Sequence, residues 1–87
     1  MSNVELSGQE PSEAKIWDAE SCFARGIDYS SGREVEVDMV EAHKWFNIAA
    51  ARGDRVAAQH REELASEMSR DEIVAALKAA REWISRH

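Results

Sequence analysis

The fold is decided by residues 19–53, which read AESCFARGIDYSSGREVEVDMVEAHKWFNIAAARG. Small residues recur at helical spacing in both halves of this stretch, and a serine–glycine break separates the halves. A length of about 35 residues is typical of a repeat unit made of two helices. Such a unit cannot bury its apolar face alone, so we expect it to stack on a copy of itself or on capping helices.

The second half of the stretch carries the clearest helix pattern. Asp38 is placed to accept hydrogen bonds from the first free amides, and Glu41 follows three residues later, which predicts a capping box. One apolar stripe follows at helical spacing: Ala42, Trp45, Phe46, Ala49 and Ala50. Arg52 and Gly53 predict the end of the helix, because glycine takes the left-handed cap most easily.

Three further helices are predicted around this one. The first begins near Pro11 and runs to about Tyr29, and the short alternating segment 34–37 is expected to be a loop because no second strand could pair with it. Asp54 is expected to cap the third helix and Ser69-x-x-Glu72 to open the fourth. Their inner faces are predicted to be Ala57, Leu64 and Met68, and then Ile73, Ala76, Leu77, Ala80 and Ile84. Residues 1–10 are predicted to be a flexible tail and residues 11–87 a single helical domain.

Several residues of the stretch sit at the intervals of a known repeat. The set comprises Ala19, Phe23, Gly26, Tyr29, Gly32, Val35, Asp38, Glu41, Ala42, Lys44, Trp45, Phe46, Ala49, Ala50 and Gly53. In these positions the stretch resembles the Sel-one-like repeat family, whose members are tetratricopeptide-like helical repeats. Arg25 departs from the pattern where the family has leucine, Asp28 where it has an apolar residue, and Glu34 where it has a second turn glycine.

The resemblance implies an all-α fold of two stacked antiparallel helix pairs. They would form a short right-handed α–α superhelix, with one Sel-one-like repeat followed by a capping helix pair. An ordinary four-helix bundle is the alternative. The resemblance also implies a non-catalytic adaptor or regulatory module that binds another protein. A structural self-association unit is a second hypothesis, and an enzyme accessory or hydrolase is a third.

Composition narrows the classes of partner. The chain has 87 residues and a formal net charge of −6. This charge disfavours binding to nucleic acid, because the affinity of proteins for nucleic acid comes mainly from basic residues. No apolar run approaches the length of a membrane span or of a signal-peptide core. The single cysteine, Cys22, excludes a disulfide within the chain. We therefore expect a cytoplasmic protein that contacts neither nucleic acid nor membrane.

The residues that usually carry chemistry do not form a catalytic pattern. Cys22 falls on the apolar arc of the first predicted helix, where small buried cysteines are common. His43, His60 and His87 are too far apart in sequence to make a helical metal pair at three- or four-residue spacing. The acidic residues are scattered among lysines and arginines, which is typical of a solvated face. We predict no catalytic residue, no metal and no cofactor.

The best candidate for an interaction surface is on the first predicted helix. Trp17 is placed on its polar face, about 115° from the apolar stripe centred on Phe23 and Ile27, and large exposed aromatics are frequent interface anchors. Arg25 and Asp28 are polar at positions that, in the family, face a preceding repeat. We predict that Trp17, Arg25 and Asp28 bind the protein partner. The alternative is that the N-terminal tail covers Trp17, and a weak homodimer through this surface is also left open.

Overall fold

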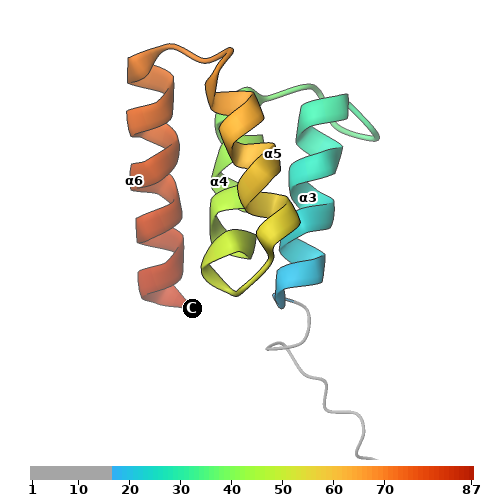
Figure 1. The fold of residues 1–87 in the computed structure, drawn as a ribbon, viewed down its shortest axis with the longest axis vertical. Helices are drawn as coiled ribbons and strands as arrows, with labels where there is room; N and C mark the ends of the chain where they lie inside the picture. Colours follow the sequence, from blue (N-terminus) through green and yellow to red (C-terminus); the bar gives the residue numbers. More distant parts are fainter. Residues whose placement is uncertain (1–16) are drawn as a thin grey trace, which may run out of the picture.

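The computed structural model describes residues 17–87 (Figure 1). This part of the chain forms α3 (Ala19–Ser31), α4 (Met39–Ala51), α5 (Arg55–Ala65) and α6 (Arg70–Arg86), and it contains no strand. The all-α prediction is confirmed, and segment 34–37 is a loop as expected. The predicted tail at residues 1–10 lies outside the described residues.

The four helices are arranged around α4. It packs against α3, α5 and α6, whereas α3 and α6 lie on opposite sides of it (Figure 1). Successive helices run antiparallel, so the carboxyl ends of α3 and α5 lie at the same end of the molecule. Because α3 and α6 do not close against each other, the arrangement is that of stacked helix pairs and differs from a closed bundle. The principal neighbour of α6 is α4, and α5 makes fewer contacts with it.

Each helix begins at a side chain that accepts a backbone amide. Asp38 accepts from the amide of Glu41 at 3.0 Å and Asp54 from that of Ala57 at 2.9 Å, as predicted. The predicted capping box at the start of α6 is complete, since Ser69 and Glu72 bond each other's backbone amides. The box predicted for α4 is only half formed. The Glu41 carboxylate instead accepts the indole N–H of Trp45 at 3.2 Å, because the indole lies one turn along the same face.

The prediction for the first helix was wrong at its start. The side chain of Asp18 accepts the amide of Ser21 at 2.8 Å, so α3 begins at Ala19 and Trp17 precedes it. Aspartate is among the strongest N-caps, and its bond to the third amide fixes the first turn. A helix that ran through Trp17 from Pro11 is therefore excluded, and residues 11–16 lie outside the described part.

The core is built largely from small side chains. Its fully buried members are Cys22, Ala42, Trp45, Phe46, Ile48, Ala49, Ala57 and Ala80. Alanine at helix contacts allows the axes to approach closely, and the few large side chains fill the remaining space. The predicted stripe of α4 is buried except for Ala50, which is half-buried, and Ile48 joins the core from outside the predicted stripe.

The stripe predicted for α6 was only partly right. Ala76 and Ala80 are buried, but Leu77 is 38% exposed and Ile84 is 40% exposed. The helix is rotated toward Trp83, whose large ring packs against the core and takes the place of the two aliphatic residues. Burial of the larger aromatic surface contributes more to the hydrophobic free energy than either aliphatic side chain would.

Two connectors use left-handed backbone. Gly32 after α3 and Gly53 after α4 have φ angles of 79° and 104°, in agreement with the predicted helix ends. Glu34 has a φ of 66°, which is unusual for a residue with a side chain. At this position the chain therefore holds a conformation that glycine adopts more easily than glutamate.

Gly26 sets the distance between α3 and α4. A Cβ atom at this position would lie 2.5 Å from two ring carbons of Phe46. We predict that Gly26→Ala lowers the free energy of unfolding, because overpacking of about 1–3 kcal/mol outweighs the gain of about 1 kcal/mol in helix propensity. Urea denaturation measures the change. In a Phe46→Leu background the same substitution should cost less, and an equal cost in both backgrounds would contradict the proposed clash.

His43 is the one buried ionisable side chain of α4. It is 2% exposed, and its Nδ1 atom has no hydrogen-bond partner among the described residues. Burial lowers the pKa of His43 below its ordinary value, and the positive charge of Arg61 lowers it further, while Glu62 acts in the opposite direction. The folded state therefore binds a proton at His43 less readily than the unfolded chain.

This difference predicts that the fold weakens in acid. Above the ordinary histidine pKa of about 6.5, the free energy of unfolding should be independent of His43. Below that pH the unfolded chain gains a proton that the folded protein resists, so stability should fall by up to about 1.4 kcal/mol per pH unit. Urea denaturation at pH 7.5 and 5.5 tests this, with His43→Gln as the control. An equal loss between the two pH values in both proteins would show that His43 is not responsible.

Candidate interaction surfaces

Three tryptophans gather where the start of α3 meets the end of α6. The Trp17 ring stacks on Trp45 with centroids 5.4 Å apart and an interplanar angle of 12°. Trp83 packs edgewise against both rings, at 5.2 Å from each. His87 stacks on the outer side of Trp83 at 4.1 Å. This group, the tryptophan cluster (Trp17, Trp45, Trp83), joins the two ends of the described chain.

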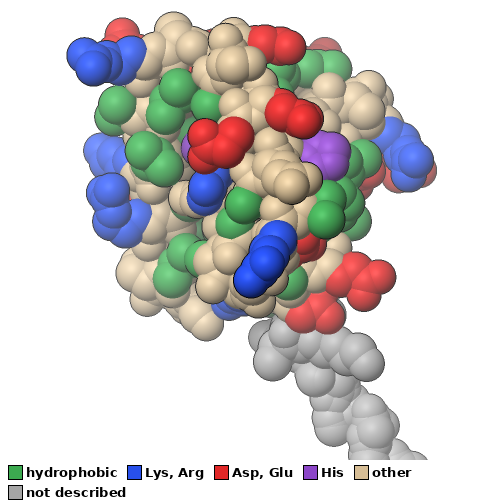
Figure 2. All heavy atoms as spheres, viewed as in Figure 1, with side chains coloured by type: hydrophobic (Ala, Val, Ile, Leu, Met, Phe, Trp, Pro, Cys, Tyr) green, Lys and Arg blue, Asp and Glu red, His purple; other side chains and the backbone are tan. Residues whose placement is uncertain are grey.

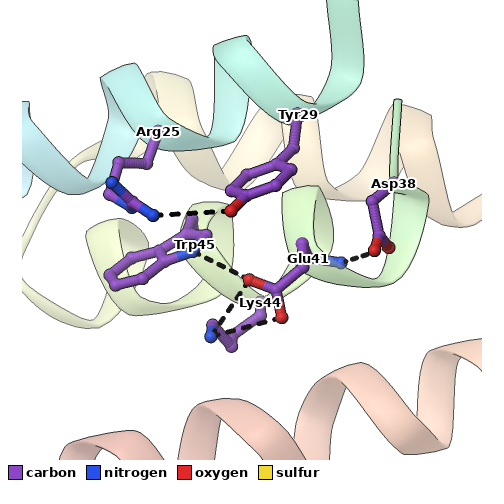
Figure 3. A network of polar contacts seen from close by, with 6 residues as sticks. All are labelled: Arg25, Tyr29, Asp38, Glu41, Lys44 and Trp45. Carbon is purple, nitrogen blue, oxygen red and sulfur yellow. Dashed lines mark hydrogen bonds and ion pairs between the residues drawn. The ribbon is translucent and has the colours of Figure 1, made fainter. Parts of the chain in front are cut away.

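Cations surround the tryptophan cluster. The Arg25 guanidinium lies 4.9 Å from the Trp45 ring centroid and reaches the Tyr29 hydroxyl at 3.5 Å (Figure 3). The Lys44 ammonium lies 4.7 Å from the same ring and forms an ion pair with Glu41 at 3.1 Å. Arg52 lies 5.4 Å from the Trp83 ring. Cation–π contacts of this kind contribute about 0.5–1 kcal/mol each at exposed sites.

The predicted site residues Trp17, Arg25 and Asp28 do not all lie where the sequence predicted. Trp17 and Arg25 both contact Trp45, so the structure brings these two together. Trp17 is half-buried and packs against the core, which corrects its predicted position on the polar face of a helix. Asp28 lies one turn beyond Arg25 on α3, and its backbone carbonyl accepts the amides of Gly32 and Arg33. Whether Trp17, Arg25 and Asp28 bind a partner stays a prediction.

The contacts of Trp17 lead to a prediction about stability. Trp17→Ala removes one stacked and two edgewise aromatic pairs, with Trp45, Trp83 and His87, each contributing about 0.5–1.5 kcal/mol beyond the area buried. We expect a loss of about 2 kcal/mol or more in the free energy of unfolding, compared with about 3–5 kcal/mol for Trp45→Ala. Thermal melting of both variants measures the difference. If Trp17→Ala melts like the unmodified protein, the ring contributes nothing to the fold and is free to act as an interface anchor.

A second surface lies on α6. Val74, Leu77 and Ile84 are 57%, 38% and 40% exposed and fall within an arc of about 80° at 100° per residue. Figure 2 shows apolar side chains exposed over α6. We call these three residues the α6 strip. Sequence analysis missed it because it assigned Leu77 and Ile84 to the buried stripe. The signal that could have revealed it was Trp83, which with Ala76 and Ala80 defines the stripe that is buried.

A third surface is a hollow between α3 and α5, with a volume of about 180 Å³. It is lined by Ser30, Phe46, His60, Glu63, Leu64 and Glu67. Phe46 is almost fully buried and His60 stacks on it at 5.2 Å, with an interplanar angle of 24°. The lining residues come from three helices and one connector, so their spacing in the sequence gave no sign that they meet.

The reactive side chains of the described part are dispersed. Cys22 is fully buried, and burial raises the pKa of its thiol, which keeps it in the unreactive protonated form. Its Sγ atom donates to the backbone carbonyl of Trp17 at 3.6 Å. Within residues 17–87, no group of three or more histidine, cysteine, aspartate or glutamate side chains is arranged to hold a metal ion. None of the described helices is both long and apolar enough to cross a membrane.

Comparisons with protein-family models, with curated proteins and with solved structures found no match for this chain. The Sel-one-like resemblance therefore rests on the residues themselves, at the positions set out above.

Proposed function

We propose that this protein is a non-catalytic protein–protein interaction module, adaptor or regulatory, of the Sel-one-like repeat type, and that it acts in the cytoplasm. The α6 strip is the observation that carries the proposal. Its three aliphatic side chains face solvent on a helix whose other side is packed on α4. Exposed apolar residues grouped on one side of a helix commonly mark the place where another protein binds, and here the exposed Arg81 lies within the same arc.

The position of the α6 strip supports this reading. In a stack of helix pairs, a further pair adds beside the last helix, and the strip lies about 100° around α6 from the buried side formed by Ala76, Ala80 and Trp83. Full burial of an aliphatic side chain contributes about 1.5–3 kcal/mol, and those of the strip are at present about half exposed. The hydrophobic contribution to the free energy of binding, for a partner that covers all three side chains, would therefore be several times the thermal energy. The same strip could be covered by a helix with a matching apolar face.

Self-association is the second candidate, and the charges of α6 favour it. The first turn of the helix carries Asp71 and Glu72 beside Arg70, which leaves one acidic charge in excess, and the last turn carries Arg86. If two copies packed through the α6 strip in antiparallel fashion, the acidic end of each would face the basic end of the other. A two-fold symmetric contact repeats such a pairing twice, which supports association and fixes its register.

A charge placed in the α6 strip tests both candidates. Leu77→Glu should reduce partner binding by at least about tenfold, since a cost of about 1.4 kcal/mol already gives that factor. Ala75→Glu is the matched control, because it is exposed, adds the same charge and lies about 150° away around the helix. Quantitative capture of proteins from the native cells measures partner binding, and sedimentation equilibrium measures dimerisation.

The outcomes separate the two candidates. Loss of a captured partner in Leu77→Glu alone supports the adaptor function. A dimer that Leu77→Glu dissociates, with no partner captured, supports self-association. A monomer that captures the same proteins before and after the substitution would show that the α6 strip binds nothing. Circular dichroism should show equal helix content in both variants.

A further inference from the structure

The hollow between α3 and α5 has the size of one side chain. Ligand pockets for small molecules and cofactors usually measure about 300–1,000 Å³, whereas this hollow measures about 180 Å³. A single long side chain from a partner fits such a space, and a cofactor does not.

The side chain beneath the hollow is aromatic and fixed in place. Phe46 is 1% exposed and is held by Phe23 at 5.7 Å and by His60 at 5.2 Å between ring centroids. Leu64 adds an aliphatic wall from α5. Because Phe46 is sealed beneath, the apolar surface of the hollow comes from the half-buried Leu64 and His60, along which the methylene stem of a long side chain can lie.

The rim of the hollow is negative for two independent reasons. Glu63 and Glu67 line it, both are exposed, and neither forms an ion pair with another residue of the part that the structure describes. Glu63 belongs to the last turn of α5 and Glu67 to the connector that follows it, so two carboxylates without an ion-pair partner among the described residues border the hollow. Figure 2 shows acidic and histidine side chains close together over the region of α5.

The second source of negative potential is the backbone. α3 and α5 run in the same direction, so the carboxyl ends of both lie beside the hollow (Figure 1). A helix carries about half a negative charge at its carboxyl end, and a basic residue in the last turn commonly offsets it. Neither α3 nor α5 has one. The two carboxylates therefore border a hollow that lies beside two helix ends with no basic residue in the last turn.

We propose that this hollow binds an arginine side chain from a basic segment of the protein partner. This arginine site rests on the proposed interaction function and is separate from the α6 strip. The methylene stem would lie along Leu64 and the edge of His60, and the guanidinium would lie between Glu63 and Glu67. Arginine fits better than lysine because its planar group donates to two carboxylates at once and stacks on rings such as His60.

Titration with a blocked amino acid tests the proposal without knowledge of the partner. N-acetyl-arginine amide is added to isotopically labelled full-length protein, and backbone amide shifts are recorded by NMR. We expect saturable shifts at Ser30, Leu64 and Glu67, with a Kd of about 1–10 mM, which corresponds to the weak end of the affinity scale. N-acetyl-citrulline amide has the same shape without the charge and should produce no saturable shift at these residues. N-acetyl-lysine amide should bind more weakly than the arginine compound.

Two matched double variants test whether the carboxylates of Glu63 and Glu67 bind the guanidinium. Glu63→Gln with Glu67→Gln should weaken binding of the arginine compound by at least about tenfold, because charge-assisted hydrogen bonds are lost. Glu36→Gln with Glu82→Gln removes the same charge from exposed positions that do not line the hollow and should leave binding unchanged. The absence of saturable shifts, equal binding of citrulline, or equal weakening in both double variants would overturn the proposal.

This test is independent of the function proposed above. If the arginine site fails while Leu77→Glu still abolishes partner capture, the module binds through α6 and the hollow is unused. If the arginine compound binds but no partner depends on Leu77, the hollow is a recognition site and the function assigned to the α6 strip is wrong.

Discussion

The close approach of α3 and α4 at Gly26 is the constraint on which the other contacts depend. Because Gly26 has no side chain, the Phe46 ring lies directly against the backbone of α3. The same ring then contacts Phe23 on α3 and His60 on α5, so one aromatic side chain links three helices. It also lies beneath the hollow between α3 and α5. A bulkier residue at position 26 would displace the ring and change the packing of all these elements.

The tryptophan cluster provides the second connection, at the opposite end of the helices from the hollow. Trp17 and Trp83 come from the two ends of the described chain and meet on Trp45. Their contact ties the start of α3 to the end of α6, although these two helices do not pack along their length. In a domain of this size, whose core consists mainly of alanines, the aromatic rings supply a large share of the buried apolar surface.

The two proposed interaction surfaces differ in chemistry and are built on different helices. The α6 strip is aliphatic and belongs to one helix, so it suits an apolar partner face. The hollow combines a small apolar surface with negative potential from Glu63, Glu67 and two helix ends, so it suits a single cation. Since they share no residue, a partner could contact either surface alone. The central helix α4 supports both, because α5 and α6 are each packed on it.

The sequence by itself determined the local features of this protein. The caps at Asp38, Asp54 and Ser69 were predictable because each depends on a side chain that bonds an amide three residues away. The glycine ends of α3 and α4 and most of the buried stripe of α4 followed in the same way. These features need only helix geometry and the hydrogen-bonding capacity of short polar side chains.

Only the tertiary structure decided which helix faces are buried and which residues from distant positions meet. On α6, both the Leu77–Ile84 side and the Trp83 side have the spacing of a buried stripe, and contact with Trp17 and Trp45 selected the latter. The position of Trp17 depended on whether Asp18 acts as the N-cap of α3 or lies inside a helix that starts earlier. As the N-cap, Asp18 leaves the Trp17 ring free to pack against Trp45 and Trp83, which are 28 and 66 residues away in the chain. The hollow required α3 and α5 to lie with their carboxyl ends together. Periodicity describes one helix at a time, whereas these outcomes depend on the free energy of packing between helices.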